Sequence, residues 1–171
     1  MTIVHTIATS EARKLRITNY ELPVYFVSRL ANHHYPQYQY NKIPIFMSKE
    51  NLLKEKCMYF AIRIYKLYRY LTEEKKEFVI SKQILRSGTS IGANRAESEY
   101  AESTDDFIHK LSISRKEANE TKFWIDLLLN LGLLTNTEFE SINADCTEII
   151  KLLTSIILSA KDKSSKERNN K

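Results

Sequence analysis

The sequence predicts an all-α protein whose central part is an antiparallel, up-down-up-down four-helix bundle. Three observations support this fold class. Apolar residues between positions 48 and 160 recur at alternating spacings of three and four, which is the pattern of a helix that buries one face. All three prolines lie within residues 1–46, so none interrupts the long helices that follow. The connections are short, and short connections place consecutive helices antiparallel.

The first predicted helix runs from about Ser48, a good N-cap residue, to Tyr70. Its apolar positions are Leu53, Cys57, Phe60, Ile64, Leu67 and Leu71. Thr72 is followed by two glutamates, so it is predicted to cap a second helix that reaches the region of Ala96. This second helix should turn four apolar side chains inward, namely Phe78, Ile84, Leu85 and Ile91.

The third predicted helix begins after Ser103, whose hydroxyl can cap free backbone N–H groups. It should end near Gly132, because glycine is the usual residue just past the end of a helix. The inward stripe of this helix is Phe107, Leu111, Ser114, Ala118, Thr121, Ile125 and Leu128.

Small residues on the second and third helices predict close packing between them. The third helix carries Ser114 and Ala118 in the middle of its stripe, and the second helix carries Gly88, Gly92 and Ala96 at a spacing of four. Each glycine costs a helix about 1 kcal/mol relative to alanine, and close backbone contact would offset that cost. The alternative is that the two glycines only end the second helix.

A fourth helix is predicted after Thr135, which forms a capping box with Glu138. Its apolar positions are Phe139, Ile142, Cys146, Ile149, Leu153, Ile156 and Ala160. The bundle is therefore expected to span residues 47–160. Residues 161–171 are polar, and we expect this tail to be disordered.

Residues 1–46 differ from the rest of the chain, because they contain the prolines and show no sustained helical or strand period. We expect an irregular extension here. Met47 is followed at once by the N-cap residue Ser48, which suggests that the natural protein begins at Met47. The adjacent His33 and His34 lack the spacing of a formed metal site, so no metal is expected.

The region from Gln83 to Leu129 also carries a family resemblance. The strings RSGTSIGAN, AES, DFIHKLSIS, KEANETKFW and LLL resemble a bacterial four-helix-bundle family. That family includes proteins encoded in intervening sequences of ribosomal RNA genes and accessory proteins of diversity-generating retroelements. The resemblance implies a closed homo-oligomeric ring, typically a pentamer, without catalytic residues.

The charge is mild overall, at +5, but it is unevenly distributed. Residues 49–95 hold 11 bases and 5 acids, whereas residues 97–148 hold 4 bases and 12 acids. Such asymmetry suits one protomer's basic half meeting a neighbour's acidic half, or an anionic partner.

A basic stripe with interleaved tyrosines is predicted on the first helix, where its members fall within an arc of roughly 100° beside the apolar seam. Such a stripe can hold phosphates and stack bases. The candidate nucleic-acid-binding residues, which extend onto the second helix, are Lys56, Tyr59, Arg63, Lys66, Lys82 and Arg86. Two alternatives stay open, a solvated helix face and an interface between subunits.

No motif of an enzyme occurs in the sequence. It contains no phosphate loop, dinucleotide fingerprint or nucleophile elbow, so we expect no catalytic residues and no cofactor. It also has no apolar run of the length that spans a membrane and no signal peptide, and a cytoplasmic protein is the expectation. Cys57 and Cys146 fall on apolar stripes and are predicted to be buried free thiols.

These observations favour a non-enzymatic, self-assembling helical scaffold that binds RNA or DNA without sequence specificity. The alternative is an adaptor that docks another protein, for example the reverse transcriptase of a diversity-generating retroelement. A homo-oligomer larger than a dimer is expected, because Tyr65, Tyr68, Phe123 and Leu127 exceed the apolar surface that four helices can bury.

Overall fold

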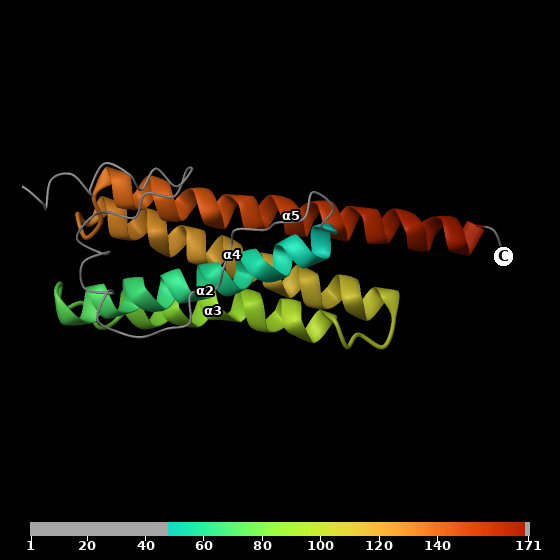
Figure 1. Cartoon of the computed structure of the whole chain (residues 1–171), viewed down its shortest axis with the longest axis horizontal. Coiled ribbons are helices and arrows are strands. Elements are labelled where there is room, and N and C mark those ends of the chain that lie inside the picture. Colours follow the sequence, from blue (N-terminus) through green and yellow to red (C-terminus); the bar gives the residue numbers. More distant parts are fainter. Residues whose placement is uncertain (1–47, 170–171) are drawn as a thin grey trace, which may run out of the picture. The chain divides into compact units, whose positions relative to one another are not determined.

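The structure is a computed structural model, and it describes residues 48–169. These residues form four helices and no strand: α2 (Lys49–Glu73), α3 (Ile80–Ser98), α4 (Thr104–Asn130) and α5 (Asn136–Asn169). Helices α2 and α4 each pack against both α3 and α5, so every helix has two neighbours (Figure 1). The predicted four-helix bundle is thereby confirmed. The expectations for residues 1–46 and for a start at Met47 lie outside the described residues.

The apolar stripes of the four helices meet in a single core. All six positions predicted for the first helix are buried, as are the central positions of the other three helices. Cys57 and Cys146 are free thiols within this core, and burial raises the pKa of each to about 12. Neither thiol is therefore a reactive thiolate near neutral pH.

The connection between α2 and α3 differs from the prediction. The hydroxyl of Thr72 donates to the carbonyl oxygen of Tyr68 at 2.9 Å, so Thr72 continues α2 and does not cap the next helix. The carboxylate of Glu77 caps α3 instead, because it accepts the backbone N–H groups of residues 79–81 at 2.6–2.8 Å. Phe78, predicted to point inward, consequently lies in the connection and is 52% exposed.

The other helix ends follow the sequence. Ser103 caps α4 by accepting the N–H of Asp106 at 3.1 Å. Gly132 follows α4 with a φ of +67°, a conformation that favours glycine. Thr135 and Glu138 form the predicted capping box, since Glu138 accepts the N–H of Thr135 at 2.8 Å and Thr135 Oγ1 accepts the N–H of Glu138 at 3.3 Å.

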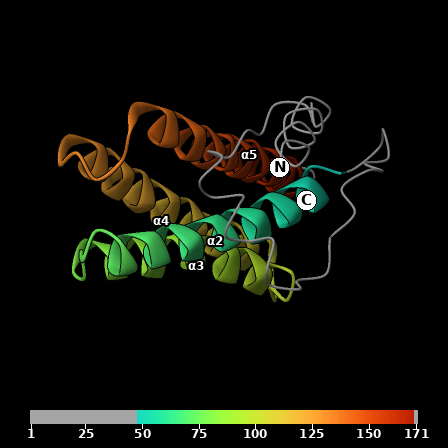
Figure 2. The same ribbon diagram turned by 60° about the vertical axis from the view of Figure 1, so that its left-hand side comes forward.

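Helix α5 is longer than predicted, and it continues through residues that were expected to be disordered. It runs to Asn169, although its last buried residue is Ile157 (Figures 1 and 2). Lysine, arginine and glutamate are good helix formers, and the i,i+4 pair Asp162/Lys166 has the acid-before-base order that favours a helix. The polar composition was therefore a poor indicator of disorder for residues 161–169.

Candidate interaction surfaces

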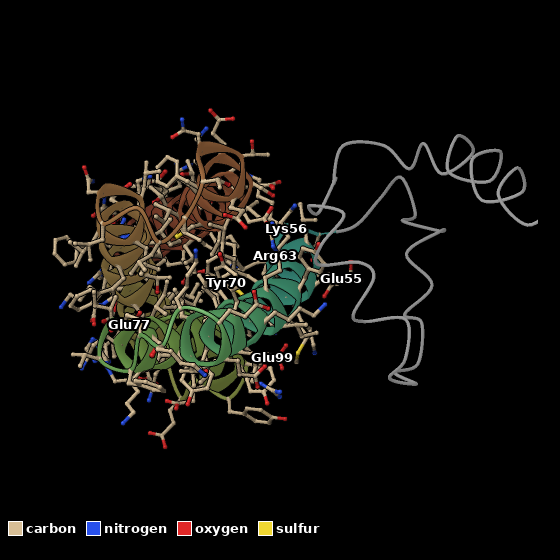
Figure 3. All side chains as sticks on the ribbon, turned by 90° about the vertical axis from the view of Figure 1, so that its left-hand side faces the viewer. Glu55, Lys56, Arg63, Tyr70, Glu77 and Glu99 are labelled. Atoms are coloured by element: carbon tan, nitrogen blue, oxygen red, sulfur yellow. The ribbon has the colours of Figure 1, made fainter. Side chains whose placement is uncertain are left out.

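The basic stripe predicted on the first helix lies against α5 and is paired there. Lys56 Nζ is 2.7 Å from Glu148 Oε2. Arg63 forms an ion pair with Asp145, and the two side chains are only 10% and 12% exposed. Arg63 also donates to Ser141, at 2.9 Å to the hydroxyl and 3.3 Å to the carbonyl oxygen. Figure 3 shows Lys56 and Arg63 on the side of α2 that faces α5.

The remaining stripe residues do not form one open surface with these. Tyr59 and Lys66 are half-buried on α2, and burial together with the nearby Arg63 lowers the pKa of Lys66. Lys82 and Arg86 lie on α3, where Lys82 is exposed. The six candidates are thus divided between two helices. The ion pairs of Lys56 and Arg63 hold α2 against α5.

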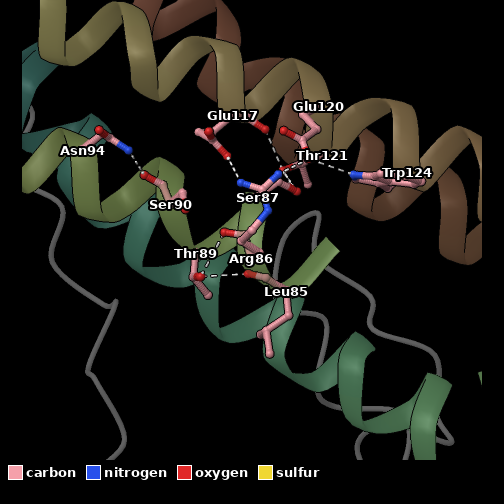
Figure 4. A network of polar contacts seen from close by, with 10 residues as sticks. All are labelled: Leu85, Arg86, Ser87, Thr89, Ser90, Asn94, Glu117, Glu120, Thr121 and Trp124. Carbon is pink, nitrogen blue, oxygen red and sulfur yellow. Dashed lines mark hydrogen bonds and ion pairs between the residues drawn. The ribbon is translucent and has the colours of Figure 1, made fainter. Parts of the chain in front are cut away.

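Arg86 belongs to a polar network between α3 and α4 (Figure 4). Its guanidinium pairs with Glu117 at 3.3 Å and with Glu120. Glu120 also accepts the indole N–H of Trp124 at 3.2 Å. The hydrogen bond from Arg86 is the main cause that lowers the pKa of Glu120, so this carboxyl stays ionised. The network therefore links α3 to α4 at the solvent-exposed edge of the seam between them.

Small hydroxyl residues line the interior of the same seam. Ser114 donates to the carbonyl oxygen of Ile91 at 2.8 Å. The hydroxyl oxygens of Thr121 and Ser87 are 2.9 Å apart, and Ser87, Ser114 and Thr121 are fully buried. Because hydrogen bonds satisfy these groups across the seam, α3 and α4 pack closely, and the described residues contain no buried side-chain nitrogen or oxygen without a partner.

The glycines of α3 face α2, which corrects the predicted pairing with Ser114 and Ala118. A Cβ atom added at Gly88 would lie 2.7 Å from Ile64 Cγ1, and one at Gly92 would lie 3.8 Å from Cys57 Cβ. Residues 87 and 91 precede these glycines by one position each, about 100° away around the helix, and they face α4 instead. Ala96 is exposed. The glycines do not end α3, which continues to Ser98.

Two apolar groups remain on the outside of the bundle. Met58, Ile62 and Tyr65, which we call the outer α2 stripe, are 63%, 41% and 49% exposed. Phe123, Leu127 and Leu131, which we call the α4 patch, are exposed except for the half-buried Leu127.

The sequence indicated part of these two groups. It singled out Tyr65 and Phe123, which are exposed, and Tyr68 and Leu127, which are half-buried. Met58 and Ile62 were missed. Met58, Ile62 and Tyr65 recur at spacings of four and three, the same helical pattern as the core stripe, and that second stripe is the signal which could have found them.

The described residues contain little that suggests chemistry. No group of three or more potential metal ligands occurs among residues 48–169. A hollow of about 440 Å³ lies at the end of the bundle where α2 begins and α5 projects, and its ionisable lining residues are Glu50 and Lys163. Within the same part of the chain, each helix is too short or too polar to cross a membrane.

Comparison with known proteins identifies the family. A search of curated proteins found no match. A crystal structure of a protein of unknown function from the S23 ribosomal protein family of Bacteroides thetaiotaomicron is 58% identical in sequence, with a TM-score of 0.64. The similarity covers 64% of this chain and 98% of that protein. The family profile described as 23S rRNA-intervening sequence protein matches residues 49–155, which is more than half of the chain. The chain therefore belongs to the 23S rRNA-intervening sequence protein family, as the motifs between Gln83 and Leu129 indicated.

Proposed function

We propose that this protein is a non-enzymatic helical scaffold that assembles with itself through the outer α2 stripe and the α4 patch. The observation that carries the proposal is the exposure of Met58, Ile62 and Tyr65 side by side on one face of α2. A contiguous apolar stripe on a soluble helix is typical of an interface, because leaving it in water forgoes about 25 cal/mol for each Å² that could be buried.

The position of the two groups favours a ring. Helices α2 and α4 do not touch each other in the bundle, so the stripe and the patch lie on different faces. A contact between the stripe of one copy and the patch of the next is heterologous, and it leaves a free stripe and a free patch at the two ends. Such contacts close into a ring where the rotation between copies permits. This scaffold would be larger than a dimer.

The scaffold is further proposed to hold RNA or DNA without sequence specificity. The net charge of +5 and the description of the family by intervening sequences of 23S rRNA support this part of the proposal. In the alternative function, an adaptor, another protein such as a reverse transcriptase would bind the outer α2 stripe in place of a second copy of this chain. The mass of the purified protein distinguishes these two uses of the stripe.

Light scattering on two matched double variants tests self-assembly. Met58→Glu with Ile62→Glu places two charges on the outer α2 stripe, whereas Val79→Glu with Leu158→Glu places two charges on exposed apolar residues elsewhere. We expect the parent and the second variant to share a mass above that of a dimer. The first variant should be monomeric with unchanged helix content by circular dichroism.

Two results would contradict the proposal. A parent that is monomeric at micromolar concentration excludes self-assembly and favours the adaptor. A stripe variant that keeps the parent's mass shows that the subunits meet through another surface.

A further inference from the structure

The C-terminal end of α5 is a helix without a core. The segment of residues 158–169, which we call the α5 extension, contains no buried residue. Figure 1 shows its last part running past the ends of the other helices, whereas Lys163 still lines the hollow described above. It carries four cations, Lys161, Lys163, Lys166 and Arg168, against the two acids Asp162 and Glu167. None of these six side chains joins a salt bridge with another described residue.

The cations of α2 and α3 contrast with those of the extension. Many of them are held by acids of the same chain, in the pairs Lys54–Glu99, Lys56–Glu148, Arg63–Asp145, Arg69–Glu73, Arg86–Glu117 and Arg95–Glu99. A carboxylate partner cancels much of the charge of a cation, so a paired cation attracts a phosphate less than an unpaired one does. Exposed lysines outside these salt bridges also lie at Lys76, Lys82 and Lys116, but the extension holds four such cations within eight residues, although the sequence pointed to α2.

The composition of the extension also indicates the kind of partner. Leu158 is its one large apolar side chain, so the extension has no apolar face to insert into a lipid surface. Lys161 to Arg168 covers about 10 Å of helix at 1.5 Å per residue. One strand of duplex DNA presents a phosphate per ~3.4 Å of its axis, so a backbone alongside offers about three phosphates to the four cations of the extension.

We propose that the α5 extension is the surface through which the scaffold binds the phosphate backbone of nucleic acid. This inference rests on the proposed binding of RNA or DNA and adds where that binding occurs. A single extension is a weak site. In an assembled ring the extension is repeated on every subunit, and one strand that contacts several extensions is bound more tightly through avidity. Contacts to phosphates alone make the binding insensitive to sequence.

Two matched triple variants of the full chain test the location. Lys161→Gln, Lys163→Gln and Lys166→Gln remove three charges from the extension. Lys76→Gln, Lys82→Gln and Lys116→Gln remove three charges elsewhere, and all six lysines are exposed and outside the salt bridges of the described residues. The probe is a labelled 30-nucleotide oligouridine, whose anisotropy is measured between 50 mM and 300 mM salt. Circular dichroism and light scattering establish that both variants stay folded and assembled.

The extension variant is expected to bind more weakly and with a shallower salt dependence. Each phosphate contact on a single strand contributes a slope of about −0.7 in log affinity against log salt. Losing three contacts should thus reduce the affinity by about 100-fold at 0.1 M salt. The other variant should stay close to the parent.

The outcomes separate the inference from the function on which it rests. If the parent binds and both variants weaken equally, or only the second variant weakens, the extension is not the binding surface. The proposed nucleic-acid binding then still stands. A parent that leaves the oligouridine free at 50 mM salt overturns both.

Discussion

Helix α2 meets its two neighbours through different chemistry. At mid-length it lies against Gly88 of α3, and a single methyl group there would come 2.7 Å from Ile64. On its other side it meets α5 through the ion pairs Arg63–Asp145 and Lys56–Glu148. The α2–α3 seam depends on close approach of the helices at a glycine, and the α2–α5 seam depends on opposite charges. The first should be sensitive to added volume, and the second to the loss of one partner.

The two ion pairs of the α2–α5 seam are not equivalent. Asp145 is 12% exposed and its partner Arg63 is also largely buried, whereas the side chain of Glu148 is 45% exposed. Removing one member of a buried pair leaves the other charge without compensation in a poorly solvated place. At the half-buried Lys56–Glu148 pair water reaches the carboxylate and weakens the attraction, so this pair contributes less to stability.

The largest effect is therefore expected from Asp145→Ala. This change should lower the free energy of unfolding by about 3 kcal/mol, because Arg63 keeps its contacts with Ser141 but loses its counter-charge. Glu148→Ala, in the same seam, should cost less than about 1 kcal/mol. Urea denaturation followed by circular dichroism measures both. Equal losses for the two variants would contradict the distinction between the buried and the half-buried pair.

An intermediate effect is expected in the α2–α3 seam, where the two glycines respond in opposite directions. Gly88→Ala should destabilise the protein by about 1–3 kcal/mol, since its Cβ overlaps the branched side chain of Ile64. Gly92→Ala should instead be neutral or stabilising by up to about 1 kcal/mol, because its Cβ meets Cys57 at an ordinary distance of 3.8 Å and alanine favours the helix.

Thermal and urea unfolding of the two alanine variants provide the check. A stable Gly88→Ala variant would mean that α2 moves away from α3 at little cost. In that event the seam would not depend on close approach at Gly88, and the contrast with the α2–α5 seam would disappear.

The helices and the core could be predicted because they depend on spacing alone. Leu53, Phe60 and Ile64 recur with the period of a helix, and that period identifies the buried face whatever the neighbours are. The caps at Ser103 and Thr135 could be predicted for a similar reason, since each acts on backbone groups within three residues of itself.

Which neighbouring helix each helix face packs against could not be predicted in the same way. Gly88 and Ser87 are adjacent in sequence and face different helices, so their partners depend on the rotation of α3 within the bundle. The complementary charges of Arg63 and Asp145 were visible in the sequence. Whether they meet within one chain or between copies depends on α2 lying beside α5, which the spacing of residues does not fix.

The cap of α3 was missed because a stronger local signal competed with it. Thr72 followed by two glutamates resembles a helix start, but its hydroxyl is occupied by the carbonyl oxygen of Tyr68. Glu77 caps the helix with a carboxylate that lies before the first helical residue and accepts three backbone N–H groups. Glu77 therefore places a charge at the end of the α2–α3 seam. In the middle of that seam the helices approach closely because Gly88 has no side chain.

The smallest effect is expected from Glu77→Gln, and it should depend on pH. Burial acts to raise the pKa of Glu77, but the N–H groups of Ile80, Ser81 and Val79 outweigh it and hold the pKa below its ordinary value of 4.5. A carboxyl whose folded pKa is depressed contributes stability above its unfolded pKa and loses that contribution as the pH falls through the folded pKa.

Glutamine still accepts a hydrogen bond but lacks the charge that favours a helix N-terminus, so the variant should lose about 0.5–1 kcal/mol at pH 7. Urea denaturation of both proteins from pH 7 down to pH 3 should show this difference shrinking below pH 4.5. A difference that stays constant over that range would mean that the hydrogen bonds of the cap stabilise α3 and that its charge does not. The α2–α5 seam would then be the part of this comparison in which stability depends on charge.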